Sequence, residues 1–273
     1  MQWLVAGLGA CLDAGLELAL GSTCAGCGVP GRALCRPCER SLPSTASAAW
    51  PTPTPPGLVR PAAGGEYAGT LRALVLAHKE HGRLALARPL GRVLAAAVAD
   101  TWLAAEPGRA LPTARRREVA DPPRPGRSLL LVPVPSHPAV VRERGHDPVL
   151  RTAQAAAASL RRAGLPARVG PLLRVTDRPE DQAGLDAEAR ARNLHGRFAA
   201  RAGAHRGRHL TEAVLVDDVV TTGATLREAQ RALEAAGTTP VGAAAVAATR
   251  RRLVMHRRTG TTRPEPERST SAQ

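Results

Sequence analysis

Aromatic residues and lysine are scarce in this chain. Aromatics make up only 2% of its 273 residues, so a packed core has to be built from leucine, valine and alanine. Lys79 is the only lysine, so almost all of the positive charge is carried by arginine. The formal net charge of +15 favours an anionic partner, although heavy use of arginine, alanine, glycine and proline also fits a base-composition bias. The shortage of aromatics disfavours nucleic-acid binding by base stacking.

Two common phosphate-binding motifs are also missing. The sequence contains no G-x-x-x-x-G-K-[ST] loop, and no G-x-G-x-x-G follows a predicted strand. The apolar residues 1–20 do not read as a targeting signal, because they lack a basic start and contain Asp13 and Glu17. Leucines at every fourth position there predict an amphipathic helix that packs on the domain. We therefore expect a cytoplasmic protein without membrane insertion.

The composition divides the chain into four parts. Residues 1–42 hold the N-terminal helix and four cysteines, and residues 43–61 are rich in proline, serine and threonine, which predicts a linker. Residues 62–250 alternate apolar segments with helical patterns, except that the polar, proline-broken residues 106–128 predict a disordered insertion. Residues 251–273 are predicted to be a basic disordered tail.

Hydrophobic patterns within residues 62–250 predict the α/β fold class. Predicted strands cover 129–135, 167–175, 213–220 and 240–249, and predicted helices cover 67–80, 83–106, 149–164 and 224–237. The strands are nearly unbroken apolar runs, which is typical of strands that are buried on both faces. We therefore expect a mostly parallel sheet flanked by helices, with a small N-terminal metal-binding module.

Four of the five cysteines form two C-x-x-C pairs with seven residues between them, Cys24 with Cys27 and Cys35 with Cys38. Each pair turns two thiolates toward one point, and two pairs supply the tetrahedral sulfur shell that Zn²⁺ prefers. Disulfides or free thiols are the alternative, but lasting disulfides are rare in cytosolic proteins. A closed four-cysteine site has no open position, so we expect structural zinc. Cys11 falls outside the spacing and is interpreted as a small core residue.

The most informative stretch is VLVDDVVTTGAT at residues 214–225. Asp217 and Asp218 lie at the end of a predicted strand, and the carboxyl edge of a parallel sheet is where ligands bind. The threonine-rich turn that follows begins a helix, whose free N–H groups attract phosphate. Gly223 would let the backbone approach an anion closely, and the hydroxyls of the threonines would add donors.

The two carboxylates point to a different part of the ligand. Ionised aspartates only accept hydrogen bonds, so Asp217 and Asp218 suit a diol such as the 2′- and 3′-hydroxyls of ribose. With phosphate on the turn, the implied ligand is a ribose 5-phosphate group. The alternative is a threonine-capped helix beside two incidental surface aspartates, but a simple cap needs neither the paired acids nor the TTG sequence.

This stretch resembles the PRPP-binding signature of type I phosphoribosyltransferases, and other segments narrow the resemblance to the ComF family of competence proteins. The segments similar to that family are YAGTLRALVLAHKEHG (67–82), LLLVPVPSHPAVVRERGHDP (129–148) and DQAGLDAEARARNLHGRF (181–198). The two C-x-x-C pairs match the family's N-terminal zinc module. The resemblance runs from about residue 1 to 250 and is interrupted by residues 106–128.

The resemblance implies a complete PRPP site with Mg²⁺. The acid pair and turn would comprise Asp217, Asp218, Val219, Val220, Thr221, Thr222, Gly223, Ala224 and Thr225. The pyrophosphate loop would comprise Pro133, Val134, Pro135, Ser136 and His137, and the family's flexible loop would include Gln182, Arg192 and Asn193. Arg142 and Arg144 would act with the acid pair in catalysis by neutralising the leaving pyrophosphate. Closure of the flexible loop would exclude water.

The chain departs from the family pattern at two places. His146-Asp147-Pro148 replaces an aromatic and two amides, and we interpret His146 as a surface or helix-start residue rather than a base. Residues 79–82, KEHG, also lack the family's aromatic.

Three hypotheses about function follow. The first is a phosphoribosyltransferase, a pentosyl-transferring glycosyltransferase that releases pyrophosphate as it acts on an unidentified acceptor. The second is a PRPP-binding regulator without turnover. The third is a competence factor for DNA uptake, in which the arginines of residues 250–258 and the zinc module meet single-stranded DNA or a partner helicase. The sequence leaves the oligomeric state open.

Overall fold

The structure is a computed structural model, and it describes residues 22–105, 128–176, 196–201 and 211–249. Several predictions made from the sequence lie outside the described residues. They concern the N-terminal helix with Cys11, the insertion at 106–127, the loop residues Gln182, Arg192 and Asn193, and the tail from residue 250.

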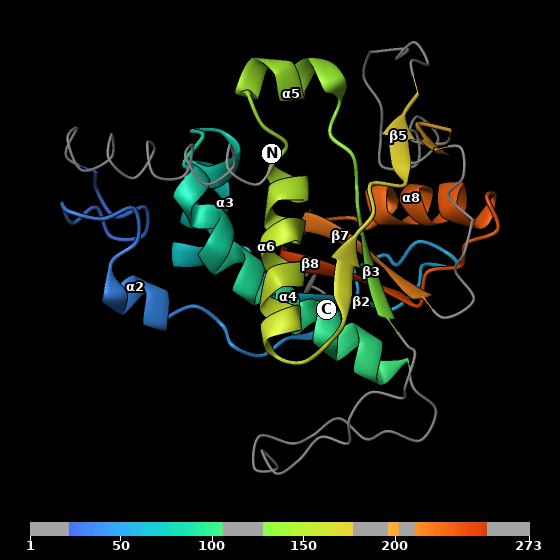
Figure 1. The fold of residues 1–273 in the computed structure, drawn as a ribbon, viewed down its shortest axis with the longest axis horizontal. Helices are drawn as coiled ribbons and strands as arrows, with labels where there is room; N and C mark the ends of the chain where they lie inside the picture. The colour runs from blue at the N-terminus through green and yellow to red at the C-terminus, as the bar shows by residue number, and fades with distance from the viewer. Residues whose placement is uncertain (1–21, 106–127, 177–195, 202–210, 250–273) are drawn as a thin grey trace, which may run out of the picture.

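A six-stranded sheet forms the centre of the described chain (Figure 1). Five strands are parallel and lie side by side in the order β2 (Pro61–Glu66), β8 (Gly242–Ala248), β7 (Thr211–Val220), β3 (Ser128–Pro133) and β4 (Ala167–Val169). The short β1 (Ser47–Ala48) pairs antiparallel with β2 at one edge. The predicted α/β class with a mostly parallel sheet is confirmed.

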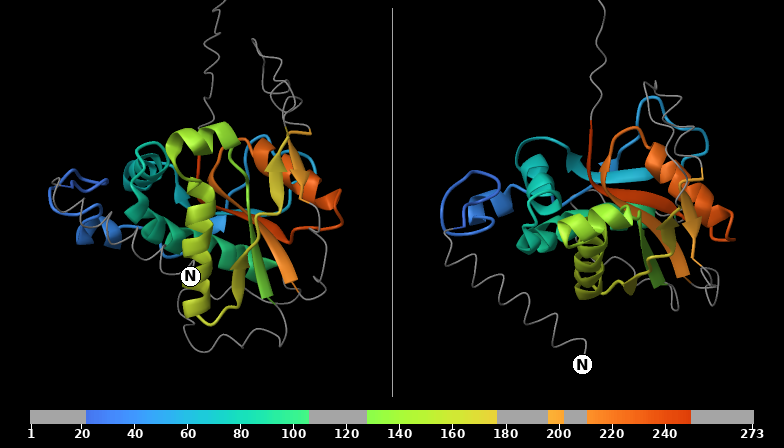
Figure 2. Two further views of the ribbon diagram at one scale, coloured as in Figure 1. Left: turned by 45° about the horizontal axis from the view of Figure 1, so that its top comes forward. Right: turned by 90° about the horizontal axis from the view of Figure 1, so that it is seen from above.

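Helices cover both faces of the sheet (Figure 2). One face carries α3 (Gly69–Lys79), the 3₁₀ turn η1 (Leu84–Leu86), α4 (Ala87–Ala104) and α6 (Pro148–Arg162). The other face carries α8 (Ala224–Glu234) and a hairpin of β5 (Leu173–Val175) and β6 (Phe198–Ala200). In the part of the chain that the structure covers, no helix is both long enough and apolar enough to cross a membrane.

The strands have apolar side chains on both faces because both faces are covered. In β3, Leu129 and Leu131 pack against the α4 side, whereas Leu130 and Val132 pack against the α8 side. With so few aromatics, close approach of backbones helps to fill the interior. A Cβ at Gly64 of β2 would lie 2.2 Å from Val93 Cγ1 of α4, so that glycine lets the helix rest directly on the sheet.

One predicted strand is divided in two. Residues 167–175 were expected to form a single strand, but β4 belongs to the main sheet and β5 to the hairpin on the α8 face. The chain changes sheet at Gly170, where a Cβ would lie 2.7 Å from Leu130 Cδ1. A glycine and the following proline interrupt strand pairing there, a local effect that the apolar pattern alone does not reveal.

Two helices begin in the segment after β3, and a side chain caps the start of each one. The short helix α5 (Pro138–Arg144), which hydrophobic periodicity did not predict, begins where His137 Nδ1 accepts a hydrogen bond from the N–H of Ala139 at 3.2 Å. Helix α6 begins where Asp147 accepts from the N–H of Leu150 at 3.0 Å, with Pro148 in its first turn. Asp147 and Pro148 therefore have a structural role as an N-cap and a helix starter.

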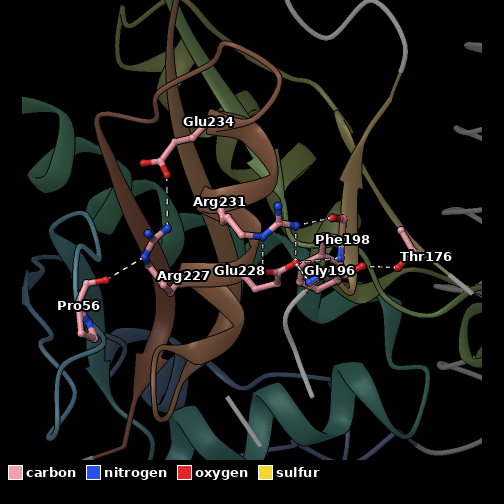
Figure 3. A network of polar contacts seen from close by, with 8 residues as sticks. All are labelled: Pro56, Thr176, Gly196, Phe198, Arg227, Glu228, Arg231 and Glu234. Atoms are coloured by element: carbon pink, nitrogen blue, oxygen red, sulfur yellow. Dashed lines mark hydrogen bonds and ion pairs between the residues drawn. The ribbon is translucent and has the colours of Figure 1, made fainter. Parts of the chain in front are cut away.

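The proline-rich residues 43–61, expected to be a linker, pack against α8. Gln230 donates to the carbonyl of Gly57 and accepts from the N–H of Val59, both at 2.9 Å. Arg227 donates to the carbonyl of Pro56 at 3.0 Å (Figure 3). Polar side chains of α8 thus satisfy backbone groups that a proline-rich segment cannot pair internally. The boundaries of the domains stay predictions.

The close contact between α4 and α6 gives a stability prediction. A Cβ at Gly91 would lie 2.5 Å from Ala155 Cβ and 2.8 Å from the carbonyl carbon of Ala155, so Gly91→Ala has to push the helices apart. Overpacking typically costs about 1–3 kcal/mol, and better helix propensity recovers only about 1 kcal/mol. We expect chemical denaturation to show a net loss of stability.

The exposed Gln154 lies on α6 and provides the control. Gln154→Ala should change the free energy of unfolding by less than about 0.5 kcal/mol. A Gly91→Ala protein as stable as the wild type would contradict the close helix contact.

Candidate functional site

The carboxyl ends of β7 and β3 bring the acid pair and the proposed pyrophosphate loop to the same edge of the sheet. Pro133, the last residue of β3, pairs with Val216 of β7, and the N–H of Val134 donates to the carbonyl of Val216 at 2.9 Å. Asp217 and Asp218 are the next two residues of β7 after Val216. The structure therefore brings together segments that are about 80 residues apart in the sequence.

Three of the four carboxylate oxygens of the acid pair have partners. Asp217 Oδ1 accepts from the N–H of Asp218 at 2.8 Å, and Asp218 Oδ1 accepts from the N–H of Val219 at 2.7 Å. Asp218 Oδ2 accepts from Lys79 Nζ at 2.5 Å. The second oxygen of Asp217 has no hydrogen-bond partner among the described residues.

Burial and neighbouring charges shift the pKa values of Asp217 and Lys79. Burial raises the pKa of Asp217 well above its ordinary value of 3.8, and the neighbouring charge of Asp218 raises it further. The pKa of Lys79 depends on two competing effects. Its burial lowers its pKa, but the attraction of Asp218 outweighs burial and the pKa is raised overall. Lys79 therefore keeps its charge beside Asp218, whereas burial favours the protonated form of Asp217.

The turn after β7 starts α8 with Gly223 in the left-handed conformation, at φ 74°. Thr221 and Thr222 are exposed, and the N–H of Ala224 donates to Thr222 Oγ1 at 3.4 Å. The N-cap residue has no side chain, so the first turn of α8 keeps N–H groups that can bind an anion.

The packing around Gly223 gives a second reason for a glycine at this position. A Cβ at Gly223 would lie 2.9 Å from Pro51 Cγ and 3.1 Å from Leu58 Cδ2, and Gly223 itself is buried. Gly223 is therefore required by its positive φ and by its contact with the 51–58 segment, and its role in the approach of an anion stays a prediction.

The two predicted catalytic arginines occupy different environments. Arg142 is exposed on α5, and no contact places it against the acid pair. Arg144 donates to Glu80 at 2.6 Å, where Glu80 follows the last residue of α3. Arg144 thus joins α5 to α3. Its role toward a leaving pyrophosphate stays a prediction.

His146 is buried, so the interpretation as a surface residue is wrong. Its Nε2 lies 3.0 Å from the carbonyl oxygen of His78, and its Nδ1 lies 3.1 Å from that of Arg144. The rings of His146 and His78 lie 5.4 Å apart. The histidine therefore fills a buried ring position between α3 and α5, where the resembling family has an aromatic.

Lys79 is the site residue that sequence reasoning missed. It ends α3, yet its ammonium group reaches an aspartate 139 residues away in the sequence. Two signals were available: Lys79 is the single lysine among 38 basic residues, and it begins the KEHG segment compared above with the family pattern. Nothing in the local pattern of α3 showed which residue it would meet.

The four cysteines of the two C-x-x-C pairs converge. Their sulfur atoms all lie within 4.8 Å of one another, and Cys27 Sγ lies 3.6 Å from Cys35 Sγ. Ligand bonds of about 2.3 Å in a tetrahedron require sulfur atoms roughly 3.8 Å apart, so this donor set fits Zn²⁺. Gly26 is needed here, because a Cβ would lie 2.9 Å from Cys38 Sγ. The predicted cysteine cluster is confirmed as a candidate zinc site.

Backbone hydrogen bonds favour the thiolate form of Cys24, which is the form that binds a metal ion. Burial raises the pKa of Cys24, but hydrogen bonds from the backbone outweigh burial and lower the pKa to about 6. The N–H groups of Gly26 and Cys35 each donate to Cys24 Sγ at 3.4 Å. Burial and the adjacent sulfurs, led by Cys35, raise the pKa of Cys38 to about 12. A divalent cation would relieve this crowding of thiols.

The cysteine module is attached to the helices beside the acid pair. Arg83, four residues after Lys79, donates to the carbonyl of Thr23 next to the first cysteine. Arg92 of α4 pairs with Glu39 of α2 (Arg36–Arg40) at 2.5 Å. The module therefore rests on α3 and α4, at the left of Figure 1.

The buried carboxylate of Glu228 on α8 binds one end of the segment that contains the predicted flexible loop, and that end is bonded in turn to the other. Glu228 accepts from the N–H of Gly196 at 2.8 Å and pairs with Arg231, which donates to the carbonyl of Phe198 at 3.1 Å (Figure 3). Thr176 Oγ1 in turn donates to the carbonyl of Gly196 at 2.6 Å. Residues 176 and 196 are thus tied together and to α8. The loop between them lies outside the described residues.

Zinc removal gives the first prediction for this region. We expect about one zinc per chain by metal analysis, and Cys24→Ser should lose most of it. The midpoint of thermal unfolding should fall by about 5 °C or more, because the metal joins the two C-x-x-C segments and α2 contributes no buried residue of its own.

Cys11→Ser is the matched control, since Cys11 lies outside the two pairs. It should keep the zinc and the melting temperature. A stable protein purified without zinc would contradict the assignment.

The pKa of Asp217 gives a second prediction. The carboxyl group is favoured in its protonated form by the folded protein, so its contribution to stability is complete below pH 3.8 and is lost as the pH rises to the raised pKa. Asp217→Asn never ionises and can still accept the hydrogen bond from Asp218. The variant should therefore unfold at a higher temperature than the wild type at pH 8, with a difference that shrinks toward pH 4.

Glu39→Gln removes a negative charge from an exposed position and serves as the control. A difference for Asp217→Asn that stays constant between pH 4 and pH 8 would show that burial does not perturb this carboxyl group.

Comparison with known proteins agrees with this geometry for one part of the chain. A family model described as the phosphoribosyl transferase domain matches residues 210–267, which include β7, the TTGAT turn, α8 and β8. No curated protein matches the chain. The family match supports a type I phosphoribosyltransferase domain, and such a domain suggests phosphoribosyl transfer or PRPP binding.

Proposed function

We propose that this protein binds PRPP together with Mg²⁺ at the carboxyl edge of β7 and transfers its phosphoribosyl group to an acceptor with release of pyrophosphate. The observation that carries the proposal is the acid pair followed by an uncapped helix turn, inside the segment that the phosphoribosyl transferase family model matches. The two halves of the segment suit the two ends of a ribose 5-phosphate.

The phosphate half rests on the start of α8. The helix has 11 residues, so its N–H groups and dipole are aligned toward the turn. The hydroxyls of Thr221 and Thr222 are exposed beside these groups and can donate to phosphate oxygens. Phosphate bound there would lie next to Val219 and Val220, which lead back to the acids.

The sugar half rests on Asp217 and Asp218. Their backbone hydrogen bonds fix both carboxylates at the strand end, and the second oxygen of Asp217 faces no protein donor among the described residues. Ionised carboxylates accept from the 2′- and 3′-hydroxyls of a ribose. Burial raises the pKa of Asp217, and hydrogen bonds from ligand hydroxyls to its ionised form would act in the opposite direction and lower it.

Carboxylate oxygens are also the ligands that Mg²⁺ prefers, so the acid pair fits the ion that accompanies PRPP. Mg²⁺ would supply positive charge that stabilises the pyrophosphate as it leaves. The chain's own contribution on that side comes from residues 133–137, which follow β3 beside the acids, and from the arginines of α5. These would orient the pyrophosphate, while the acid pair holds the sugar.

Membership of the ComF family belongs to the same proposal. It is supported by the converging cysteines next to α3 and by the juxtaposition of residues 133–137 with the acid pair. The acceptor is unassigned, and a regulator that binds PRPP without turnover fits the same site. A role in competence, with single-stranded DNA or a helicase as partner, stays a prediction from the sequence, since residues 250–258 lie outside the described part of the chain.

Isothermal calorimetry with Mg²⁺ and PRPP tests the proposal. The zinc-loaded wild type should bind one PRPP per chain, and the double variant Asp217→Ala/Asp218→Ala should lose binding almost completely, because the sugar hydroxyls lose their acceptors. Absence of binding to the wild type would overturn the site assignment and leave only the fold.

Glu234→Gln is a suitable control, because Glu234 lies at the far end of α8 and accepts from Arg227 at 3.4 Å. It should bind PRPP like the wild type. Release of pyrophosphate in the presence of candidate acceptors then distinguishes a transferase from a binding protein.

A further inference from the structure

The acid pair already has a cation within the protein. Lys79 Nζ lies 2.5 Å from Asp218 Oδ2, and the side chains of Lys79 and Asp218 are only 34% and 17% exposed. Lys79 is also the only lysine of a chain whose other basic residues are arginines. A compact ammonium group can approach a single carboxylate oxygen as a point charge, much as a metal ion would, whereas a guanidinium presents a wide planar fork.

The backbone around Lys79 is held firmly in position. The carbonyl of the preceding residue, His78, faces His146 Nε2 at 3.0 Å, and the following residue, Glu80, accepts from Arg144 at 2.6 Å. His78 Nδ1 also lies 3.2 Å from the carbonyl oxygen of Arg83. Contacts on both sides therefore fix the last turn of α3 against the segment that follows β3. Lys79 does not reach Asp218 by chance from a mobile surface loop.

The charges at this edge explain what the lysine does. Two adjacent carboxylates without a counter-ion would attract divalent cations and repel phosphate groups. With Lys79 Nζ 2.5 Å from Asp218 Oδ2, the ammonium group offsets one of the two carboxylate charges at this edge. A sugar phosphate can therefore approach it.

We propose that Lys79 is the resident counter-cation of the acid pair and determines its specificity, excluding a free divalent cation and admitting an anionic ribose phosphate. The inference rests on the proposed function for the identity of the sugar phosphate. Its metal-exclusion half depends only on Lys79 and the two aspartates. In this arrangement Mg²⁺ enters the site together with the polyanionic ligand rather than before it.

The metal-exclusion half is tested with Mn²⁺ alone, followed by the loss of its free-ion signal in electron paramagnetic resonance. The protein is zinc-loaded, and Mn²⁺ does not compete for a thiolate site that holds zinc. The wild type should bind Mn²⁺ weakly. Lys79→Met keeps the aliphatic stem but removes the charge, and it should gain one Mn²⁺ site with an affinity about tenfold higher or more.

Three variants locate the effect. Lys79→Arg keeps the positive charge, although in a wider group, and should bind Mn²⁺ more weakly than Lys79→Met. Adding Asp217→Asn and Asp218→Asn to Lys79→Met should abolish the gained site. Arg92→Met breaks the exposed pair with Glu39, in which the side chains are 46% and 43% exposed, and should gain no Mn²⁺ site. Equal Mn²⁺ affinity in the wild type and Lys79→Met would overturn the proposal.

The anion half is tested with ribose 5-phosphate in the absence of divalent cations. Lys79→Met should bind it about tenfold or more weakly than the wild type, because the phosphate then meets an uncompensated acid pair. Unchanged or tighter binding by Lys79→Met would overturn the proposal, since the lysine would then be only a competitor for Asp218. Should the wild type bind no sugar phosphate at all, the proposed function fails, while the Mn²⁺ experiment still decides whether Lys79 excludes metal.

Discussion

The central place of β7 in the sheet is the constraint on which the rest of the site depends. With β8 on one side and β3 on the other, and helices over both faces, the strand can carry polar side chains only where it leaves the core. Asp217 and Asp218 stand at that point. Their backbone hydrogen bonds and the ion pair with Lys79 offset the cost of partly burying two adjacent carboxylates.

Helix α8 links the phosphate turn to two distant segments of the chain. On one side, Arg227 and Gln230 bind the backbone of residues 56–59. On the other, Glu228 and Arg231 bind the base of the β5–β6 hairpin (Figure 3). The helix that begins with the TTGAT turn is thereby braced from both sides. This fits a site in which an anion must be held by fixed N–H groups rather than by mobile side chains.

The sequence predicted those features whose cause is local. Apolar runs predicted β3, β7 and β8, and the spacing of the four cysteines predicted their convergence. Predictions failed where a neighbour decided the outcome. His146 is buried because His78 of α3 packs against it, whereas the strand expected at 167–175 is divided by the local pair Gly170 and Pro171. The sequence also left the packing of residues 56–59 open, because their partners, Arg227 and Gln230, lie some 170 residues later.

The sequence by itself therefore determined the chemistry of one segment, because paired acids, a threonine-rich turn and a helix start are all encoded within residues 214–225. It also determined the parallel α/β class through the length and apolar character of its strands. Only the tertiary structure decided which cation faces the acids. Lys79 meets Asp218 because parallel strand pairing and the packing of α3 bring the two together across 139 residues, and long-range packing of this kind leaves no periodic pattern in the sequence.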